Sequence, residues 1–213
     1  SQFLDFLSVI LTVFLFYLAF PSGGYGLLSW VAIIPIIISL NRTTDTRNAF
    51  MLGLLAATLG WMCSIWWAAG GISRITDTSI NLIIPIVFIF CLISALPYAL
   101  GCWCHVKFKL GRSASGALIS ASIFTALVNF IPHILPGNLA HALYLQPLFI
   151  QVADLGGVAI VFFIIHAVSI LTANGYTASS NNKKSAFSCF VLSIVIFLSN
   201  SLYGNNRINN IDE

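Results

Sequence analysis

Charged residues are scarce in this sequence. Asp, Glu, Lys and Arg together make up 7% of its 213 residues, while hydrophobic residues make up 59%. Soluble domains usually contain about 25% charged and about 45–50% apolar residues. A water-soluble globule of this composition would lack the polar groups needed to cover its surface, whereas a bilayer accepts such a chain. A soluble fold is therefore excluded, and lipid is the expected solvent.

Two other kinds of pattern are also missing. The nine Lys and Arg residues are scattered over short segments and form no basic stripe, so we expect no nucleic-acid partner despite a net charge of +3. Cys102, Cys104 and His105 are too few to complete a tetrahedral zinc site, and we predict no metal or other cofactor. The five cysteines lie in or beside apolar segments and are expected to be small buried side chains: Cys63, Cys91, Cys102, Cys104 and Cys189.

Seven apolar stretches run through the chain, each long enough, or nearly so, to cross about 30 Å of hydrocarbon as a helix. They are residues 3–20, 25–40, 49–70, 80–103, 115–135, 148–171 and 186–202. This pattern predicts an all-α, polytopic transmembrane bundle with about seven spans. The second stretch is the shortest, and with the first it could form a helical hairpin or a partly re-entrant unit. We expect residues 1–203 to form one membrane domain and residues 204–213 a polar periplasmic tail or linker.

The basic residues predict the orientation of the bundle. One set of loops holds seven of them and the opposite set holds Arg74 and Arg207, if the chain crosses at every stretch. Loops rich in Lys and Arg stay in the cytoplasm. The N-terminus is therefore predicted to be cytoplasmic and the C-terminus periplasmic. The seven are Arg42, Arg47, Lys107, Lys109, Arg112, Lys183 and Lys184.

Three segments carry a family resemblance. The first is Phe20-Pro21-Ser22-Gly23-Gly24-Tyr25-Gly26 through Trp30, followed by Ile34-Pro35. The second is residues 53–71, with Gly60-Trp61, Trp66-Trp67 and Gly70-Gly71. The third runs from Leu135-Pro136 through Gln146-Pro147-Leu148 to Gln151, Gly156-Gly157 and Val158. In this order they resemble the first hairpin, the third span with its external loop, and a later Pro, Gln and Gly segment of bacterial apolipoprotein N-acyltransferases.

The resemblance implies the membrane half of such an enzyme. Members of the family have seven spans, an external nitrilase-like domain and a last span, and they move an acyl chain from a phospholipid to a lipoprotein through a Glu-Lys-Cys site in the external domain. This sequence is expected to stop where that domain would begin, either as a piece of a longer acyltransferase or as a stand-alone relative. Its one Glu is Glu213, so we assign no catalytic residue.

The expected role is to anchor an acyltransferase in the bacterial inner membrane and to admit phospholipid from the outer leaflet. A lipoprotein substrate or a catalytic domain would be further partners. Family members usually have a Glu and then an Arg in the fifth span, where this sequence has Asn129 and Pro132. That departure leaves an alternative open: a stand-alone, non-enzymatic membrane component, for example of a conjugal transfer system.

Polar residues near the predicted outer ends of the spans are the candidate site. Polar groups in hydrocarbon are costly and suggest function by default, although some bond only to water or to backbone at the interface. We expect six of them to line a polar pocket that contacts phospholipid or substrate: Arg74, Asn129, His133, His141, Gln151 and Asp154. Asp154 would pair with Arg74 or His141, or cap a helix.

Three further expectations concern a histidine, glycines and prolines in or near the spans. His166 lies deeper in the sixth stretch, where an interhelical hydrogen bond or a proton relay are its possible roles. Gly70-Gly71 and Gly156-Gly157 are expected at turns or at close helix contacts. Pro85 and Pro97 are expected to kink the fourth span.

Overall fold

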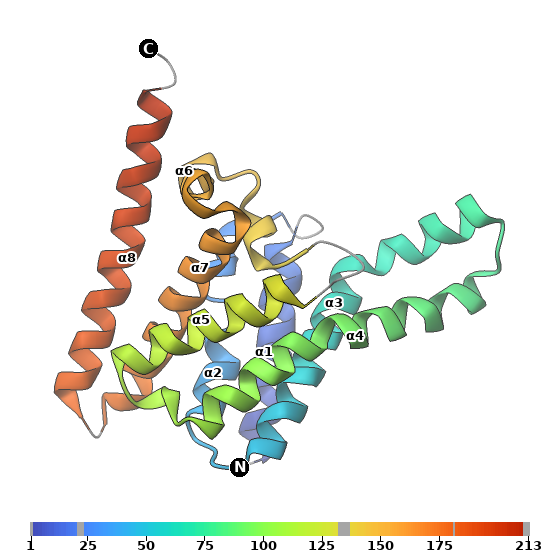
Figure 1. Cartoon of the computed structure of the whole chain (residues 1–213). Helices are drawn as coiled ribbons and strands as arrows, with labels where there is room; N and C mark the ends of the chain where they lie inside the picture. Colours follow the sequence, from blue (N-terminus) through green and yellow to red (C-terminus); the bar gives the residue numbers. More distant parts are fainter. Residues whose placement is uncertain (1, 21–23, 132–136, 181, 211–213) are drawn as a thin grey trace.

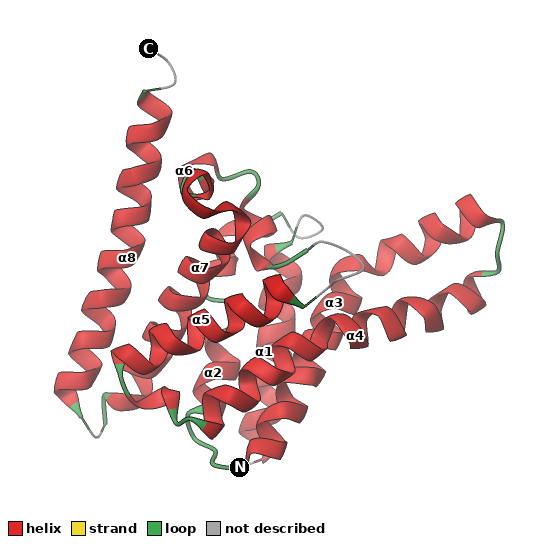
Figure 2. Ribbon diagram, viewed as in Figure 1, coloured by secondary structure: helices red, strands yellow, loops and turns green. Residues whose placement is uncertain are grey.

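Helices joined by loops make up the part of the chain that the structure describes. The computed structural model describes residues 2–20, 24–131, 137–180 and 182–210, and Figure 2 shows helices and loops but no strand in them. The predicted all-helical class is therefore confirmed for this part of the chain. In chain order the elements are α1 (Gln2–Ala19), η1 (Gly26–Trp30), α2 (Ile34–Leu40), α3 (Thr46–Thr76), α4 (Ile80–Lys107), η2 (Leu110–Arg112), α5 (Ala114–Phe130), η3 (Leu139–Leu143), α6 (Pro147–Ile150), α7 (Ala153–Ala178) and α8 (Lys183–Asn209).

The helices form a bundle with two flanking parts. α1, α2, α5 and α7 lie in the middle, the α3–α4 hairpin projects to one side, and α8 stands on the other side against α7 (Figure 1). One end of the bundle holds η1, η3 and α6 with the C-terminal part of α8, and the opposite end holds η2 with the start of α8. We call these the η3 end and the η2 end. Figure 1 shows α1 beginning near the η2 end and α8 finishing at the η3 end.

Four helices are long and apolar enough to cross a membrane: α3, α4, α7 and α8. α1, the Gly26–Leu40 segment and α5 are apolar but shorter. Each of the seven predicted stretches thus contains helix among its described residues, while seven crossings and the orientation of the termini stay predictions. α4 continues through Pro85 and Pro97 as a single helix.

The second stretch is a broken element. A turn over residues 31–33 separates η1 from α2, and Pro35 lies in the first turn of α2. The first amide groups of a helix have no partner within it. One of them, the amide of Ile36, donates to Thr12 Oγ1 of α1 at 3.2 Å. This bond ties the buried start of α2 to α1, which suits the predicted hairpin of these two segments.

Glycines set the course of the later helices. Gly157 has φ 68° and ψ −165°, a conformation open essentially only to glycine, so the helical path of α7 breaks there. Of the two expectations for Gly156-Gly157, a turn or a close helix contact, this break agrees with a turn. Gly70 and Gly71, in contrast, lie inside α3, and a Cβ on either would meet nothing closer than 4.0 Å, so neither a turn nor a close contact exists there.

α8 extends beyond the predicted seventh span. It continues to Asn209, so most of the expected polar tail is helical. Gly204 in this extension packs against the carbonyl of Leu148 so closely that a Cβ would overlap it. The extra helical turns of α8 thus pack on the segment around Leu148. Hydropathy does not report such packing.

Cysteines were predicted to be buried, and three of the five are. Cys91, Cys102 and Cys189 are buried, Cys104 is half-buried and Cys63 is exposed. Cys102 lies where α3 and α4 meet at Gly53, whose Cβ, if present, would be 2.7 Å from the Cys102 sulfur. Small residues allow this close approach of two helices. Cys63 differs because a helix in lipid is apolar on its outer face too, so hydropathy does not separate the two faces.

Candidate functional site

The η3 end is built by contacts between segments far apart in the sequence. Gly26 of η1 packs on the carbonyl of Ala142 in η3, where any side chain would overlap the oxygen. Leu139 and Leu143, the first and last residues of η3, are fully buried. The two short 3-10 helices therefore form one layer across the end of α1 and α7, and the first hairpin and the third recognised segment meet there.

His141 belongs to this layer and is held in a defined orientation. Its Nδ1 accepts the backbone N–H of Asn138 at 3.1 Å, while the Asn138 side chain accepts the amide of Ala140 at 3.0 Å. This reciprocal capping box uses the Nδ1 lone pair, so in the neutral ring the proton is on Nε2. The exposed ring can therefore donate one hydrogen bond to a neighbouring molecule.

A cavity of about 190 Å³ opens beside His141. Its wall is mostly apolar, and the two side chains with polar tips, those of His141 and Tyr144, are both exposed. The lining comprises Ala140, His141, Tyr144, Ile150, Ala153, Val158 and Val161. Sites for whole drug-sized ligands are about 300–1,000 Å³. The cavity is thus sized for part of a flexible apolar chain.

Asp154 lies on the neighbouring surface and is paired with α8. Its carboxylate is 3.0 Å from Nε of Arg207, and the Tyr203 hydroxyl donates to both carboxylate oxygens at 2.9 Å. The expected pairing of Asp154 with Arg74 or His141, or its use as a helix cap, is therefore wrong. The reason is the course of α8, which carries Tyr203 and Arg207 on one helix face next to the start of α7. Tyr203 and Arg207 are four residues apart and so share a helix face, and Arg74 is the one other basic residue predicted on that side of the membrane. These two features were the available signal for the partner of Asp154.

Three other predicted site residues bond to the backbone of their own helices. Arg74 Nε donates to Gly70 at 3.1 Å, Asn129 Nδ2 to Thr125 at 2.8 Å and Gln151 Nε2 to Pro147 at 3.1 Å. Arg74 lies near the tip of the projecting α3–α4 hairpin (Figure 1).

The six predicted residues are therefore only partly brought together. His141 lines the cavity, and Gln151 and Asp154 are next in sequence to Ile150 and Ala153, which line it too. Arg74 lies on the hairpin, Asn129 near the end of α5, and His133 falls outside the described residues.

The polar groups of the described η3 end suit binding more than acyl transfer. The lysines lie at the η2 end, in the residues around η2 and at the start of α8, and Glu213 is outside the described residues. A thioester route needs a carboxylate base, a cation and a thiol within hydrogen-bond reach. The described arrangement instead offers an apolar pocket, a histidine ring that can donate a hydrogen bond, and a surface ion pair.

His166 was expected to bond to another helix or to relay protons. Its Nδ1 lies 3.0 Å from the carbonyl of Phe162 in its own helix, so the expected interhelical bond is not made among the described residues. Stacking on Phe162, at a centroid distance of 3.8 Å, holds the ring in the core.

Comparison with known proteins agrees with the three recognised segments. The sequence profile of the family described as apolipoprotein N-acyltransferase N-terminal domain matches residues 13–171. A protein of Geobacter metallireducens named apolipoprotein N-acyltransferase is 33% identical over 63 residues. That match covers 30% of this chain and 12% of the relative. The profile match spans most of the chain, including α3, α4, α5 and the η3 cavity, and the chain therefore belongs to the apolipoprotein N-acyltransferase N-terminal domain family.

Proposed function

We propose that this chain is the membrane domain of an N-acyltransferase in the bacterial inner membrane, and that its η3 end admits an acyl chain of an outer-leaflet phospholipid. The observation that carries the proposal is the apolar cavity beside His141, which lies within the family match. In this orientation the lysine-containing η2 end is cytoplasmic, as the charge distribution predicts.

The cavity wall supports a lipid ligand by its chemistry. Ile150, Ala153, Val158 and Val161 would contact methylene groups of the acyl chain. The His141 Nε2–H and the Tyr144 hydroxyl lie at the polar rim, where a donor can meet an ester carbonyl. Inside the membrane such a chain already lies in lipid, so shape and the polar rim decide what is retained.

A pair of alanine variants tests this function. Ala153→Phe places a ring in the cavity, whereas Ala159→Phe adds the same ring to the same helix at a half-buried position that does not line it. We expect phosphatidylethanolamine retained on the purified protein, measured by native mass spectrometry, to fall several-fold for Ala153→Phe and to stay near the parent value for Ala159→Phe. Equal retention by both variants would refute lipid admission at this cavity.

The reaction itself needs a separate test. Membranes containing the protein as it occurs in its host would be supplied with phospholipid labelled in its acyl chains and a diacylated lipopeptide. Transfer of label to the N-terminal amine supports an acyltransferase. Lipid retention without transfer supports the alternative, a non-enzymatic membrane component.

A further inference from the structure

A basic cleft lies at the η2 end, the opposite end from the cavity of the proposed function. Its volume is about 470 Å³, within the range of ligand sites. Four cationic side chains line it, all exposed: Arg42, Lys107, Lys109 and Arg112. Among the described residues none of the four has an acidic partner at ion-pair distance. No ion pair among the described residues therefore involves the cations of the cleft.

The floor of the cleft is a closed hydrogen-bond network. Asn41 Nδ2 donates to Asn174 Oδ1 at 3.0 Å and to Thr177 Oγ1 at 2.8 Å, so Asn41 Oδ1 is the acceptor for His105 Nε2 at 2.8 Å. His105 Nδ1 then accepts the hydroxyl of Ser120 at 2.8 Å. Each group has a partner, and His105 is 1% exposed. Fully satisfied buried networks rigidify a structure.

The network holds the segments that carry the cations. Asn174 Nδ2 donates to the carbonyl of Leu110 at 3.0 Å, which fixes η2 beside α7. Gly111 lies so close to Asn41 that a Cβ would overlap the amide oxygen. Three separate segments, the end of α2, the end of α4 and η2, therefore present their cations around one concave surface.

Acidic groups near the cleft are engaged elsewhere. Asp45, between two segments of the wall, accepts the amides of Arg47 at 2.9 Å and Asn48 at 3.2 Å and so caps α3. Lys107 leans over Trp103, its Nζ 5.9 Å from the ring centroid. The cleft thus combines four cations with an ordered polar floor, an arrangement that suits an anion with several oxygen atoms.

We propose that this cleft binds the phosphate of an anionic lipid headgroup from the adjacent leaflet. The positive-inside rule accounts for basic residues in loops on one side of the membrane. It does not account for their arrangement around one cleft. Arg forms bidentate bonds to phosphate and Lys adds a point charge. The apolar helices that frame the cleft would leave the lipid tails in the bilayer. This site is independent of the η3 cavity and of any acyl-transfer activity.

Two double variants of equal charge test the cleft. Arg42→Gln with Lys109→Gln removes two cations from it, and Lys183→Gln with Lys184→Gln removes two exposed cations from the same end that do not line it. Phosphatidylglycerol and phosphatidylethanolamine would be added to the purified full chain and retention measured by native mass spectrometry. We expect the parent to prefer phosphatidylglycerol and the cleft variant to bind it about thirtyfold more weakly, because each of the two removed cations contributes about 1 kcal/mol.

The control variant should lose less than half as much binding free energy for phosphatidylglycerol as the cleft variant does. Equal losses in the two double variants, or no preference for phosphatidylglycerol, would overturn the proposal. Inorganic phosphate distinguishes the source of the ligand. If it displaces phosphatidylglycerol at millimolar concentration, the phosphate group alone is recognised and a free anion can occupy the site. If phosphate does not displace phosphatidylglycerol, the cleft requires the intact lipid and not the phosphate group alone.

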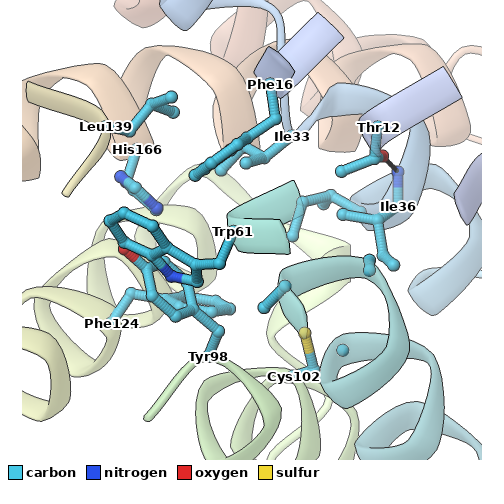
Figure 3. A pocket seen from close by; sticks show the side chains of 14 residues that line it. Thr12, Phe16, Ile33, Ile36, Trp61, Tyr98, Cys102, Phe124, Leu139 and His166 are labelled. Carbon is cyan, nitrogen blue, oxygen red and sulfur yellow. Dashed lines mark hydrogen bonds between the residues drawn. The ribbon is translucent and has the colours of Figure 1, made fainter. Parts of the chain in front are cut away.

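A different observation concerns the core. A cavity of about 40 Å³ lies between α1, α3, α4 and α7. Figure 3 shows the side chains of Trp61, Tyr98 and His166 gathered on one side of it, across from Thr12 and Ile36. The Trp61 Nε1, Tyr98 hydroxyl and His166 Nε2 are all buried, and none has a hydrogen-bond partner among the described residues. An unmet buried polar group costs about 1–3 kcal/mol.

By type, the three groups include both hydrogen-bond donors and acceptors. Since His166 Nδ1 donates to Phe162, Nε2 is an acceptor in the neutral ring, while Trp61 donates and Tyr98 can do both. A cavity needs about 10–15 Å³ of such volume to hold a water molecule, together with two to four polar partners. We infer that one or two water molecules bridge these groups within the bundle.

The sign of one stability change tests this inference. If water bridges the groups, Tyr98→Phe removes a hydrogen bond and should lower the Tm, whereas removal of an unmet hydroxyl would raise it. Tyr176→Phe, at a 56% exposed position of α7, is the matched control. A Tm for Tyr98→Phe equal to or above that of the control would overturn the inference. So would an experimental density map in which a protein side chain fills the space between His166 and Tyr98.

Discussion

Gly26 offers the sharpest perturbation of the η3 end. Its neighbour in space is a backbone carbonyl, that of Ala142, which a Cβ would overlap. A flexible side chain could rotate away, but a carbonyl moves only with its segment. Gly26→Ala must therefore separate η1 from η3, and η3 carries His141 and part of the cavity wall.

The size of the effect follows from overpacking. Inserting a methyl group into a close contact usually costs about 1–3 kcal/mol. For a chain of this length, 1 kcal/mol corresponds to about 2–4 °C in Tm, so we expect a fall of about 5 °C for Gly26→Ala. Gly71→Ala is the control, because that glycine is helical and a Cβ would meet no atom within 4 Å. Alanine is favoured over glycine in a helix by about 0.5–1 kcal/mol, so the control should raise the Tm by about 2 °C.

Thermal unfolding of the two purified variants in the same detergent measures both shifts. Lipid retention measured in parallel should fall for Gly26→Ala and stay unchanged for Gly71→Ala. The reasoning would be refuted if both substitutions raised the Tm, because η1 and η3 would then not be in the close contact described.

The remaining predictions concern an ion pair, a buried hydrogen bond and a backbone conformation. The Asp154–Arg207 pair is largely exposed, so a double-mutant cycle with Asp154→Asn and Arg207→Gln should give a coupling of only about 0.5 kcal/mol, and a value several times larger would contradict a surface pair. Asn41→Leu leaves the buried His105 Nε2–H without its acceptor and should destabilise the chain by about 1–3 kcal/mol in denaturant or thermal unfolding; an unchanged midpoint would argue against the network. Gly157→Ala forces a side chain into φ 68°, ψ −165°, and should cost about 1–3 kcal/mol; a neutral result would mean that α7 does not break there.

Most of the architecture follows from hydropathy, because apolar length decides which segments can be helices in lipid. For this reason each of the seven predicted stretches contains helix among its described residues. The break in the second stretch was foreseeable from its shortness. Two adjacent glycines were not a sufficient signal, because Gly156-Gly157 interrupts α7 whereas Gly70-Gly71 lies inside α3. The extension of α8 was not foreseeable, since Gly204 reaches the Leu148 carbonyl only in the assembled bundle.

The candidate site was harder to predict for a related reason. Periodicity places residues on one helix face but does not say which faces of distant helices meet. Asp154 was identified as notable, yet its partner Arg207 lies 53 residues later on a helix whose position depends on the whole bundle. The buried network of Asn41, His105 and Asn174 was not identified at all. Asn and His near helix ends usually face water, so their sequence positions carried no signal.

The account depends most directly on the bundle spanning the membrane with its η3 end outside. Ser79→Cys in the α3–α4 loop and Ser180→Cys between α7 and α8 are matched probes, because both serines are exposed and neither caps a helix through its side chain. They would be introduced singly after replacement of the five native cysteines. A membrane-impermeant maleimide should label Cys at position 79 in intact spheroplasts and Cys at position 180 only after lysis. Labelling of both positions, or of position 180 alone, before lysis would contradict the account.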